Sequence, residues 1–258
     1  MVLDKYSHLK EELMQCINSI LTIEGIASGI CEELREKIEN NVFNLVVLGQ
    51  FKRGKTSLIN ALLAAELLPT AVVPLTSIAT ILMYGETFNI KVYLNDGRVT
   101  EIEPATLNQY VTEKGNPRNQ KDVQEVIITY PSSYLRDGVR LIDTPGVGSV
   151  YEHNTDVAYQ YLPKSDAALF LLSVDQPVSK AELDFLKDVK EYSHRIFFLQ
   201  NKADYVSSED LIVASSLTLL LPKFIGEKII LKNERNQGKT DSDTAKSSYI
   251  NRKIVVHI

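Results

Sequence analysis

The sequence predicts an α/β fold in which a mostly parallel central sheet is flanked by helices, with an amphipathic helical segment ahead of it. Three polar motifs support this prediction: Gly49–Thr56, Asp143–Gly146 and Asn201–Asp204. Each motif follows an apolar, β-prone run, and amphipathic helical patterns separate the runs. Strands that alternate with helices in this way are typical of parallel sheets, so each motif falls at the end of a predicted strand.

Composition limits the class of protein. The 258 residues suffice for one large α/β domain plus an appendage, and 44% hydrophobic with 24% charged residues is ordinary for a globular chain. A net charge of −5 argues against nucleic acid as a dominant partner. Cys16 and Cys31 have no CxxC spacing or nearby His, so we interpret both as reduced core residues. No run of 18 apolar residues occurs, so no transmembrane helix is predicted.

Residues 1–40 are predicted to form one helix or a pair of helices. Apolar residues recur there at steps of three and four, and Gly25 and Gly29 favour a break between the two halves. Such a stripe needs an apolar partner, so the segment either docks on the main domain or associates with another chain. The stripe consists of Leu9, Leu13, Cys16, Ile17, Ile20, Ile30, Leu34 and Ile38.

The first strand, predicted at 42–48, leads into a glycine-rich loop and then a helix at 56–68 that Pro69 ends. This is the context of a phosphate-binding loop, whose backbone N–H groups and following helix N-terminus attract an anion. Lys55 is expected to reach the β- and γ-phosphates of a nucleotide, and the Thr56 hydroxyl to ligate Mg²⁺. The alternative is a glycine turn that happens to precede a lysine. The predicted phosphate-binding residues are Gly49, Gln50, Phe51, Lys52, Arg53, Gly54, Lys55, Thr56 and Ser57.

The stretch between the first two motifs is long. Residues 70–77 form a loop rich in helix-breaking residues and hydroxyls, and Asn95-Asp96-Gly97 predicts a tight hairpin turn. Strands are predicted at 78–84, 89–94, 98–102, 123–130 and 139–142, with a short helix at 104–113 and a polar loop at 115–121.

Asp143 and Gly146 follow the strand at 139–142. A strand-terminal Asp in a chain with a phosphate loop is the expected second partner of Mg²⁺, usually through a water. The Gly146 N–H is expected to bond a γ-phosphate and to release it after hydrolysis.

The second half of the chain predicts a helix at 156–162, a strand at 167–174, a helix at 179–192 and a strand at 195–199. The last strand ends in Asn201, Lys202, Ala203 and Asp204. The Asp204 carboxylate can accept from both the ring N–H and the amine of guanine, whereas adenine presents the opposite polarity. With Asp143 and Gly146, the residues Asn201, Lys202 and Asp204 complete the predicted nucleotide site, and GTP is the predicted nucleotide.

The chain resembles the GTPase domain of bacterial dynamin-family proteins. The resemblance rests on the run Gly49–Thr56, the segments Leu67–Thr70 and Pro74–Thr76, and the insertion, meaning the extra strands and helix predicted between Lys55 and Asp143. The resemblance covers residues 40–205. It implies that Thr76 is the switch threonine that closes over Mg²⁺ and the γ-phosphate; the alternative is an ordinary loop hydroxyl, since Ser77 and Thr80 are close by. The implied catalytic residues are Lys55, Thr76 and Gly146, and the implied metal ligands are Thr56, Thr76 and Asp143.

The resemblance also sets expectations for domains and function. It implies a neck-like helical segment at 1–40, a dynamin-type GTPase domain at 41–231 and a polar tail at 232–258 that is truncated or atypical. The expected activity is Mg²⁺-dependent hydrolysis of GTP to GDP and phosphate, with a GTPase-domain dimer as partner. A role in membrane remodelling is implied through regions absent from this chain, and the location is cytoplasmic or peripheral at the inner membrane.

The sequence departs from relatives in two ways. Eukaryotic dynamins carry Gln-Ser where this chain has Phe51 and Lys52, so Lys52 either meets transition-state charge or is a solvated surface lysine. Val147 stands where Ras-like enzymes carry a water-orienting Gln, so intrinsic hydrolysis is expected to be slow unless a second GTPase domain completes the site. Arg53 is expected to point away from the γ-phosphate or toward a facing subunit.

Two other functions stay open from the sequence. One is a GTP-binding regulatory module with negligible turnover. The other is an Era-like GTPase of the ribosome, against which the negative charge and the large insertion count. A helix is predicted at 211–221, and 233–238 is a weak candidate for the loop that completes a guanine site.

Overall fold

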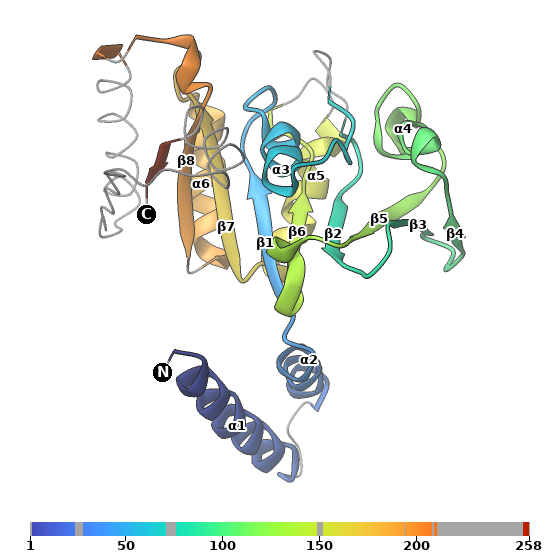
Figure 1. Ribbon diagram of the computed structural model, residues 1–258, viewed down its shortest axis with the longest axis vertical. Coiled ribbons are helices and arrows are strands. Elements are labelled where there is room, and N and C mark those ends of the chain that lie inside the picture. The colour runs from blue at the N-terminus through green and yellow to red at the C-terminus, as the bar shows by residue number, and fades with distance from the viewer. Residues whose placement is uncertain are drawn as a thin grey trace, which may run out of the picture.

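The computed structural model describes residues 2–23, 28–70, 76–148, 152–193, 195–207, 209–210 and 255–257. A single sheet organises them, in the strand order β4-β3-β5-β2-β6-β1-β7-β8-β9 (Figure 1). The strands are β1 Phe43–Leu48, β2 Thr80–Tyr84, β3 Asn89–Leu94, β4 Val99–Glu101, β5 Val123–Tyr130, β6 Val139–Asp143, β7 Ala167–Ser173, β8 Ile196–Asn201 and β9 Val255–His257. The α-helices are α1 Val2–Leu21, α2 Ser28–Glu39, α3 Lys55–Leu63, α4 Asn108–Val111, α5 Glu152–Tyr161 and α6 Lys180–Tyr192.

The centre of the sheet is parallel, as predicted. β1 pairs in parallel with β6 and β7, and β7 pairs in parallel with β8. The insertion extends this core on one side, where β2 runs antiparallel to β6 and carries β5, β3 and β4 outward. β2 pairs in parallel with β5, whereas β3 is antiparallel to both β5 and β4. The fold is therefore a phosphate-loop α/β core with a wide mixed extension.

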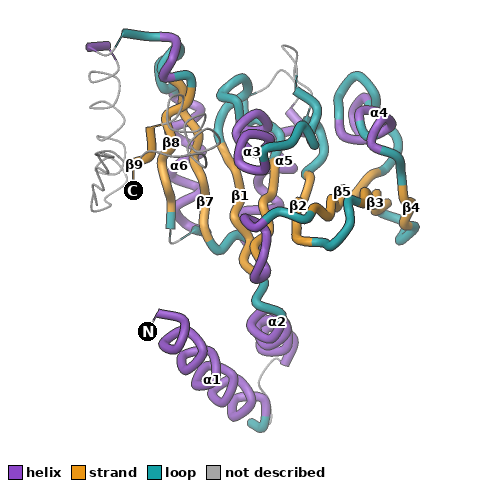
Figure 2. Tube along the Cα trace, viewed as in Figure 1, coloured by secondary structure: helices purple, strands orange, loops and turns teal. Residues whose placement is uncertain are grey.

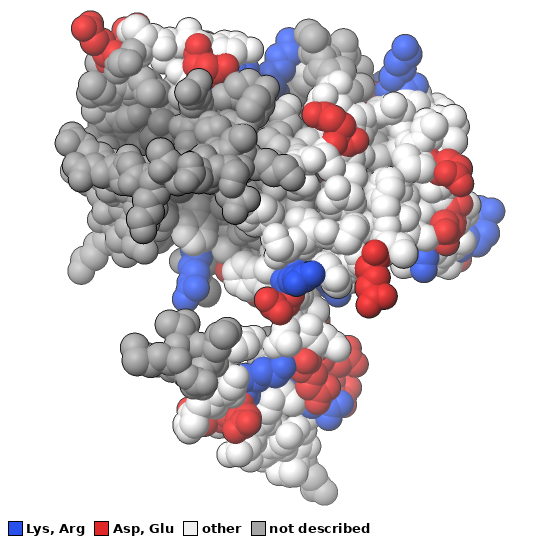
Figure 3. Space-filling view, viewed as in Figure 1, with Lys and Arg blue, Asp and Glu red and all other residues white. Residues whose placement is uncertain are grey.

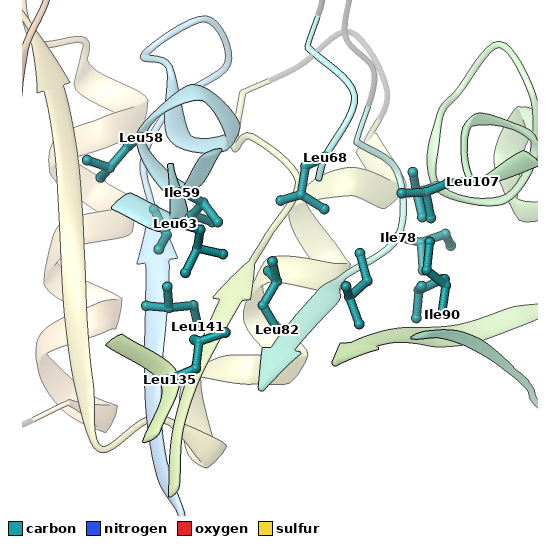
Figure 4. Close-up of a cluster of buried hydrophobic side chains, with 14 of the residues drawn as sticks. Leu58, Ile59, Leu63, Leu68, Ile78, Leu82, Ile90, Leu107, Leu135 and Leu141 are labelled. Carbon is teal, nitrogen blue, oxygen red and sulfur yellow. The ribbon is translucent and has the colours of Figure 1, made fainter. Parts of the chain in front are cut away.

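Alternating residues of β1 send apolar side chains to both faces, because successive residues of a strand point in opposite directions. Val46 and Leu48 pack with residues of α5 and α6 on one face, including Tyr161 and Phe185. Val47 packs on the other face in a second cluster that includes residues of α3 and the insertion. Figure 4 shows this second cluster running from α3 across β6 and β2 toward the insertion. Its labelled members are Leu58, Ile59, Leu63, Leu68, Ile78, Leu82, Ile90, Leu107, Leu135 and Leu141.

The N-terminal segment is a pair of helices, α1 and α2, which lies beyond one end of the strands (Figure 2). Ile17 is buried, but Leu9, Leu13, Ile30 and Leu34 are exposed. Polar contacts tie the pair to the sheet: Lys37 Nζ lies 2.6 Å from Asp166 Oδ1. Acidic and basic side chains lie close together around this junction (Figure 3).

The interpretation of the cysteines as core residues is wrong. Both are free thiols, but Cys16 is exposed and Cys31 is only half-buried. The reason is that much of the apolar stripe of α1 and α2 faces outward rather than into a core.

The helix after the phosphate loop is shorter than predicted, ending at Leu63 rather than near Pro69. Ala64 takes a left-handed conformation with φ 50° and ends the helix. The buried Asn60 side chain then donates to Leu68 O and accepts from Leu68 N, at 2.8 and 2.9 Å. This tertiary contact folds residues 64–68 back against the helix and overrides their own helical propensity.

Helix α6 begins as predicted, with Ser179 and Glu182 forming a capping box. An apolar face made of Ala181, Leu183, Leu186 and Val189 would be expected from the sequence, but Ala181 is exposed and Glu182 is fully buried. The predicted helix at 211–221 and the loop at 233–238 lie outside the described residues. So does the polar tail at 232–258, except for β9, which pairs antiparallel with β8.

Candidate nucleotide and magnesium site

The three motifs meet at one edge of the sheet, where strands β1, β6 and β8 end. In the β1–β6 ladder Val47, two residues before Gly49, pairs with Asp143. In the β7–β8 ladder Ser173 pairs with Asn201. The carboxyl end of a parallel sheet is where α/β proteins bind ligands, and the strand order places all three motifs there.

The phosphate loop has the backbone that its glycines allow. Gly54 has φ 91°, and a Cβ there would lie 2.3 Å from Asn201 Nδ2. Lys55 opens α3 and is 7% exposed, with its Nζ donating to Gly49 O at 2.9 Å and Gln50 O at 3.2 Å. The ammonium group therefore sits inside the loop, where a phosphate group would meet it.

Asp143 lies at the centre of the predicted metal site and is 1% exposed. The Thr56 hydroxyl donates to Asp143 Oδ2 at 2.9 Å. The Thr76 hydroxyl lies close enough to the same carboxylate for its hydrogen bond to lower the pKa of Asp143. The three predicted metal ligands thus lie together, although Thr56 is in the first turn of α3, Thr76 precedes β2 and Asp143 ends β6.

Burial shifts the pKa values of Asp143 and Lys55 in opposite directions. Desolvation raises the pKa of Asp143 to about 6, against the opposing effects of Lys55, Thr56 and Thr76. Desolvation also lowers the pKa of Lys55 to about 8, and the charges of Asp143 and Glu182 oppose it. Strong shifts of this kind concentrate at functional sites, because a site built for a charged ligand holds charges out of water.

The donor set fits a magnesium ion. Asp143 Oδ1 is buried and accepts no hydrogen bond, so this oxygen is left without the partner that a buried carboxylate needs. Hydroxyl and carboxylate oxygens are what Mg²⁺ prefers, and the ion keeps waters and substrate phosphates as its remaining ligands. Within the described residues no group of three or more His, Cys, Asp or Glu side chains could hold a metal. The described residues at this site would therefore hold Mg²⁺ only together with waters and substrate phosphates.

The turn after Asp143 closes against the phosphate loop. Thr144 Oγ1 donates to Val47 O at 2.8 Å, and a Cβ on Gly146 would lie 2.7 Å from the Phe51 backbone. Phe51 N donates to Val147 O, and Val147 N to Gly49 O, both at 3.3 Å. Glycine is thus needed at 146, and the Val147 side chain is buried rather than turned to a reacting water.

The Asn201–Asp204 motif, which is predicted to bind the guanine base, contacts the phosphate loop directly. Asn201 Nδ2 donates to Arg53 O at 2.9 Å. Lys202 has φ 60°, and its Nζ lies 2.8 Å from Asp175 Oδ2. Asp204 is exposed, so its carboxylate is accessible to a ligand.

The Arg53 side chain turns inward and away from the phosphate side. It is fully buried and pairs with Glu182, with Nε–Oε1 2.8 Å and Nη2–Oε2 2.6 Å. It also donates to Ser173 Oγ at 2.9 Å and to the carbonyls of Gln176 and Pro177 at 2.9 and 3.0 Å. The expectation that Arg53 turns away from the γ-phosphate is met, and full burial in its own domain leaves no path to a facing subunit.

Two residues of the predicted phosphate loop have exposed side chains. Lys52 and Ser57 are exposed, and the Lys52 ammonium lies 5.4 Å from the centre of the Phe51 ring. Sequence reasoning missed Ser173, Asp175 and Glu182, which hold Arg53 and Lys202. The Ser179-x-x-Glu182 spacing could have indicated the capping box, but nothing local indicates that Glu182 also pairs with Arg53.

A strand-terminal phosphate loop, a buried aspartate and an Asn-Lys-x-Asp motif on one edge of such a sheet define a phosphate-loop GTPase. The chain belongs to the dynamin family, whose family model matches residues 45–203. These residues include the phosphate loop, Thr76, Asp143, and Asn201 through Ala203.

Relatives extend over most of this chain. An "Uncharacterized protein in xynA 3'region" of Caldicellulosiruptor sp. (strain Rt8B.4) is 44% identical over 227 residues, 88% of this chain and 56% of the relative. The "Bacterial dynamin-like protein" of Nostoc punctiforme is 28% identical over 233 residues, 79% of this chain and 33% of the relative. The chain thus spans about half or less of the length of these relatives.

Solved structures agree on the fold. A structure described as "An oligomerised bacterial dynamin pair provides a mechanism for the long range sensing and tethering of membranes" matches with a TM-score of 0.60 at 20% identity. It covers 87% of this chain, which in turn covers 37% of that chain. At this identity the match shows a shared fold.

Proposed function

We propose that this chain binds GTP with Mg²⁺ and hydrolyses it to GDP and phosphate. The observation that carries the proposal is the buried Asp143 carboxylate, whose Oδ1 accepts no hydrogen bond, with the hydroxyls of Thr56 and Thr76 beside it and Lys55 in the adjacent loop. Unpaired charge of this kind is costly in a folded protein and is retained where a ligand compensates it. Family membership supports the choice of reaction.

In this proposal each group has one task. Lys55 binds the β- and γ-phosphates, the Gly146 N–H bonds the γ-phosphate, and Asp204 selects guanine. Thr56, Thr76 and Asp143 would hold the Mg²⁺, which supplies neutralisation of charge on the phosphates. Residues 41–231 would be the GTPase domain and residues 1–40 a neck-like helical segment.

One observation favours a second candidate, a GTP-binding module with negligible turnover. Val147 is buried and apolar, and Arg53 is held inside by Glu182, so neither side chain orients water or meets transition-state charge in this domain. We therefore propose that hydrolysis requires association of two GTPase domains, which would enclose Thr76 and the reacting phosphate and exclude water. The similar structure described as an oligomerised dynamin pair supports self-association, and the sensing and tethering of membranes described for that pair supports a family-based role at membranes.

Turnover measured across protein concentrations separates the candidates. Specific activity that rises with concentration, together with dimer formation by light scattering with GDP and aluminium fluoride but not with GDP alone, is the expected result. Fast turnover by a strict monomer would contradict the dimer mechanism. Binding of GTP without turnover at any concentration would select the binding module. No helix in the described part of the chain is long and apolar enough to span a bilayer.

A further inference from the structure

The insertion between β2 and β5 contacts the chain next to the switch threonine. Thr76 forms an isolated antiparallel bridge with Thr112, which directly follows α4. Ser77 N donates to Val111 O at 2.9 Å, and the Ser77 hydroxyl lies 3.4 Å from the same carbonyl. The end of α4 therefore fixes the backbone on the carboxyl side of Thr76.

The chain beyond Thr76 is set firmly in the core. Ser77, Ile78, Ala79 and Thr80 are each at most 2% exposed. In Figure 4 the side chain of Leu107, which comes just before α4, lies near those of Ile78 and Ile90. Thr76 is thus the last position before a buried segment that packs under the insertion.

The part of the insertion that holds Thr76 is itself fixed by buried polar groups. Thr112 is 3% exposed; its hydroxyl donates to Asn108 O at 2.6 Å and accepts from Gly115 N at 3.0 Å. Asn116 is fully buried; its Nδ2 donates to Tyr110 O at 3.0 Å and its Oδ1 accepts from Lys121 N at 2.9 Å. A satisfied buried network of this kind has one low-energy arrangement, because each unmade bond would cost a desolvated group.

We propose that Thr112 and Asn116 are positioning residues that hold Thr76 in place for Mg²⁺ and the γ-phosphate, so that the insertion sets the preference for GTP over GDP. This inference rests on the proposed function. The γ-phosphate and its Mg²⁺ order a switch threonine, and a diphosphate does not. A weakened anchor should therefore lower affinity for the triphosphate and leave affinity for GDP unchanged.

Thr112→Val tests this with little change of shape, since it removes only the hydroxyl. With the full chain and Mg²⁺, we expect the Kd for a non-hydrolysable GTP analogue (guanosine β,γ-imidotriphosphate) to rise at least fivefold. The Kd for GDP should stay within twofold, and Thr112→Ser, which keeps the hydroxyl, should restore both values. Tyr161→Phe is the matched control: it removes another buried hydroxyl, bonded to Glu125 at 2.7 Å on the opposite face, and should leave the ratio of the two Kd values unchanged.

A second measurement uses the unaltered chain, in case Thr112→Val does not fold. Coupling between two sites is reciprocal, so the GTP analogue should slow hydrogen exchange of the amides in residues 107–121 more than GDP does. Equal protection by both nucleotides, or an equal loss of affinity for both in Thr112→Val, would overturn the inference. If the unaltered chain binds the analogue but Thr112→Val leaves the ratio of the Kd values for the analogue and GDP unchanged, the positioning role of Thr112 is contradicted and the proposed function is not. If it binds no guanine nucleotide, the proposed function falls as well.

Discussion

The nucleotide edge of the sheet and the N-terminal helix pair both hold groups without a matching partner, but of opposite kinds. At the nucleotide edge, charge is buried: Asp143 is 1% exposed and its Oδ1 accepts no hydrogen bond. On the helix pair, apolar surface is exposed, with Ile30 at 68% and Leu9 at 51%. Burying a charge costs far more than exposing one leucine or isoleucine, so the two regions should respond differently to the same kind of substitution.

The buried charge marks the nucleotide edge as the region that carries chemistry. An exposed apolar residue is common on protein surfaces and needs no ligand to explain it. A buried, unsatisfied carboxylate beside a buried ammonium is rare, and it points to an ion that compensates the charge. We therefore place the reaction at the nucleotide edge.

The largest expected effect is on the ion pair beneath the phosphate loop. Glu182→Ala leaves the fully buried Arg53 guanidinium without its carboxylate and should lower the free energy of unfolding by about 3–5 kcal/mol. Chemical denaturation measures this. Asp96→Ala is the control, since Asp96 lies 2.7 Å from Arg98 in an exposed ion pair, and its loss should lower the free energy of unfolding far less than Glu182→Ala does. Equal losses in the two variants would show that burial does not set the cost.

The pH dependence of stability tests whether burial destabilises the charged forms of Asp143 and Lys55. Folding raises the pKa of Asp143 from 3.8 to about 6, so the native state binds more protons and stability should fall as pH rises between these values. The pKa of Lys55 falls from 10.5 to about 8, so stability should rise again with pH above about 8.

The ligand-free protein should therefore be least stable between about pH 6 and 8. Its free energy of unfolding should rise by about 3 kcal/mol as the pH falls from 6 to below 3.8, which is the acidic limb of the profile. Asp143→Asn should flatten that limb and raise stability at neutral pH. Denaturation of the ligand-free protein at a series of pH values checks both points. An acidic limb as steep in Asp143→Asn as in the unaltered chain would assign the slope to other groups.

Loss of the loop lysine should damage binding more than stability. Lys55→Ala removes the ammonium that lies inside the phosphate loop, and GTP affinity or turnover should fall at least tenfold, about 1.4 kcal/mol. Lys91→Ala, at an exposed position of β3, should leave both unchanged. Fluorescent-nucleotide titration measures the affinity, and unchanged binding in Lys55→Ala would remove this loop from the site.

The smallest effect is expected on the helix pair. Ile30→Ser changes a side chain that is 68% exposed and should alter the free energy of unfolding by less than about 0.5 kcal/mol. Ile17→Ala, at a position 8% exposed, should cost about 2 kcal/mol. A large cost for Ile30→Ser would mean that this exposed surface is covered in solution.

Sequence reasoning could predict the elements whose signals are local. The strands at β3 and β5 match their predicted bounds, because apolar and β-branched runs between turn residues specify them without help from the rest of the fold. The start of α6 was readable in the same way, from the spacing of Ser179 and Glu182. The position of the nucleotide edge followed from motifs that each end a strand.

What the sequence could not predict depends on contacts between distant residues. The Asn60 side chain binds Leu68 and so folds residues 64–68 back against α3. Glu182 pairs with Arg53 across 129 residues of sequence. The bridge between Thr76 and Thr112 likewise exists only because the insertion folds back on the switch. None of these pairs has a periodic or local pattern, so only the folded arrangement reveals it.

The central claim is that the motifs at this edge form a single site for Mg²⁺ and GTP. Competition binding of GTP, XTP and ATP to the full chain, with and without Mg²⁺, tests it most directly. The account predicts that GTP binds at least tenfold more tightly than ATP, that Mg²⁺ strengthens GTP binding, and that Asp204→Asn weakens GTP and relaxes the preference toward XTP. A chain that prefers ATP, or that binds GTP equally well without Mg²⁺, would contradict the account.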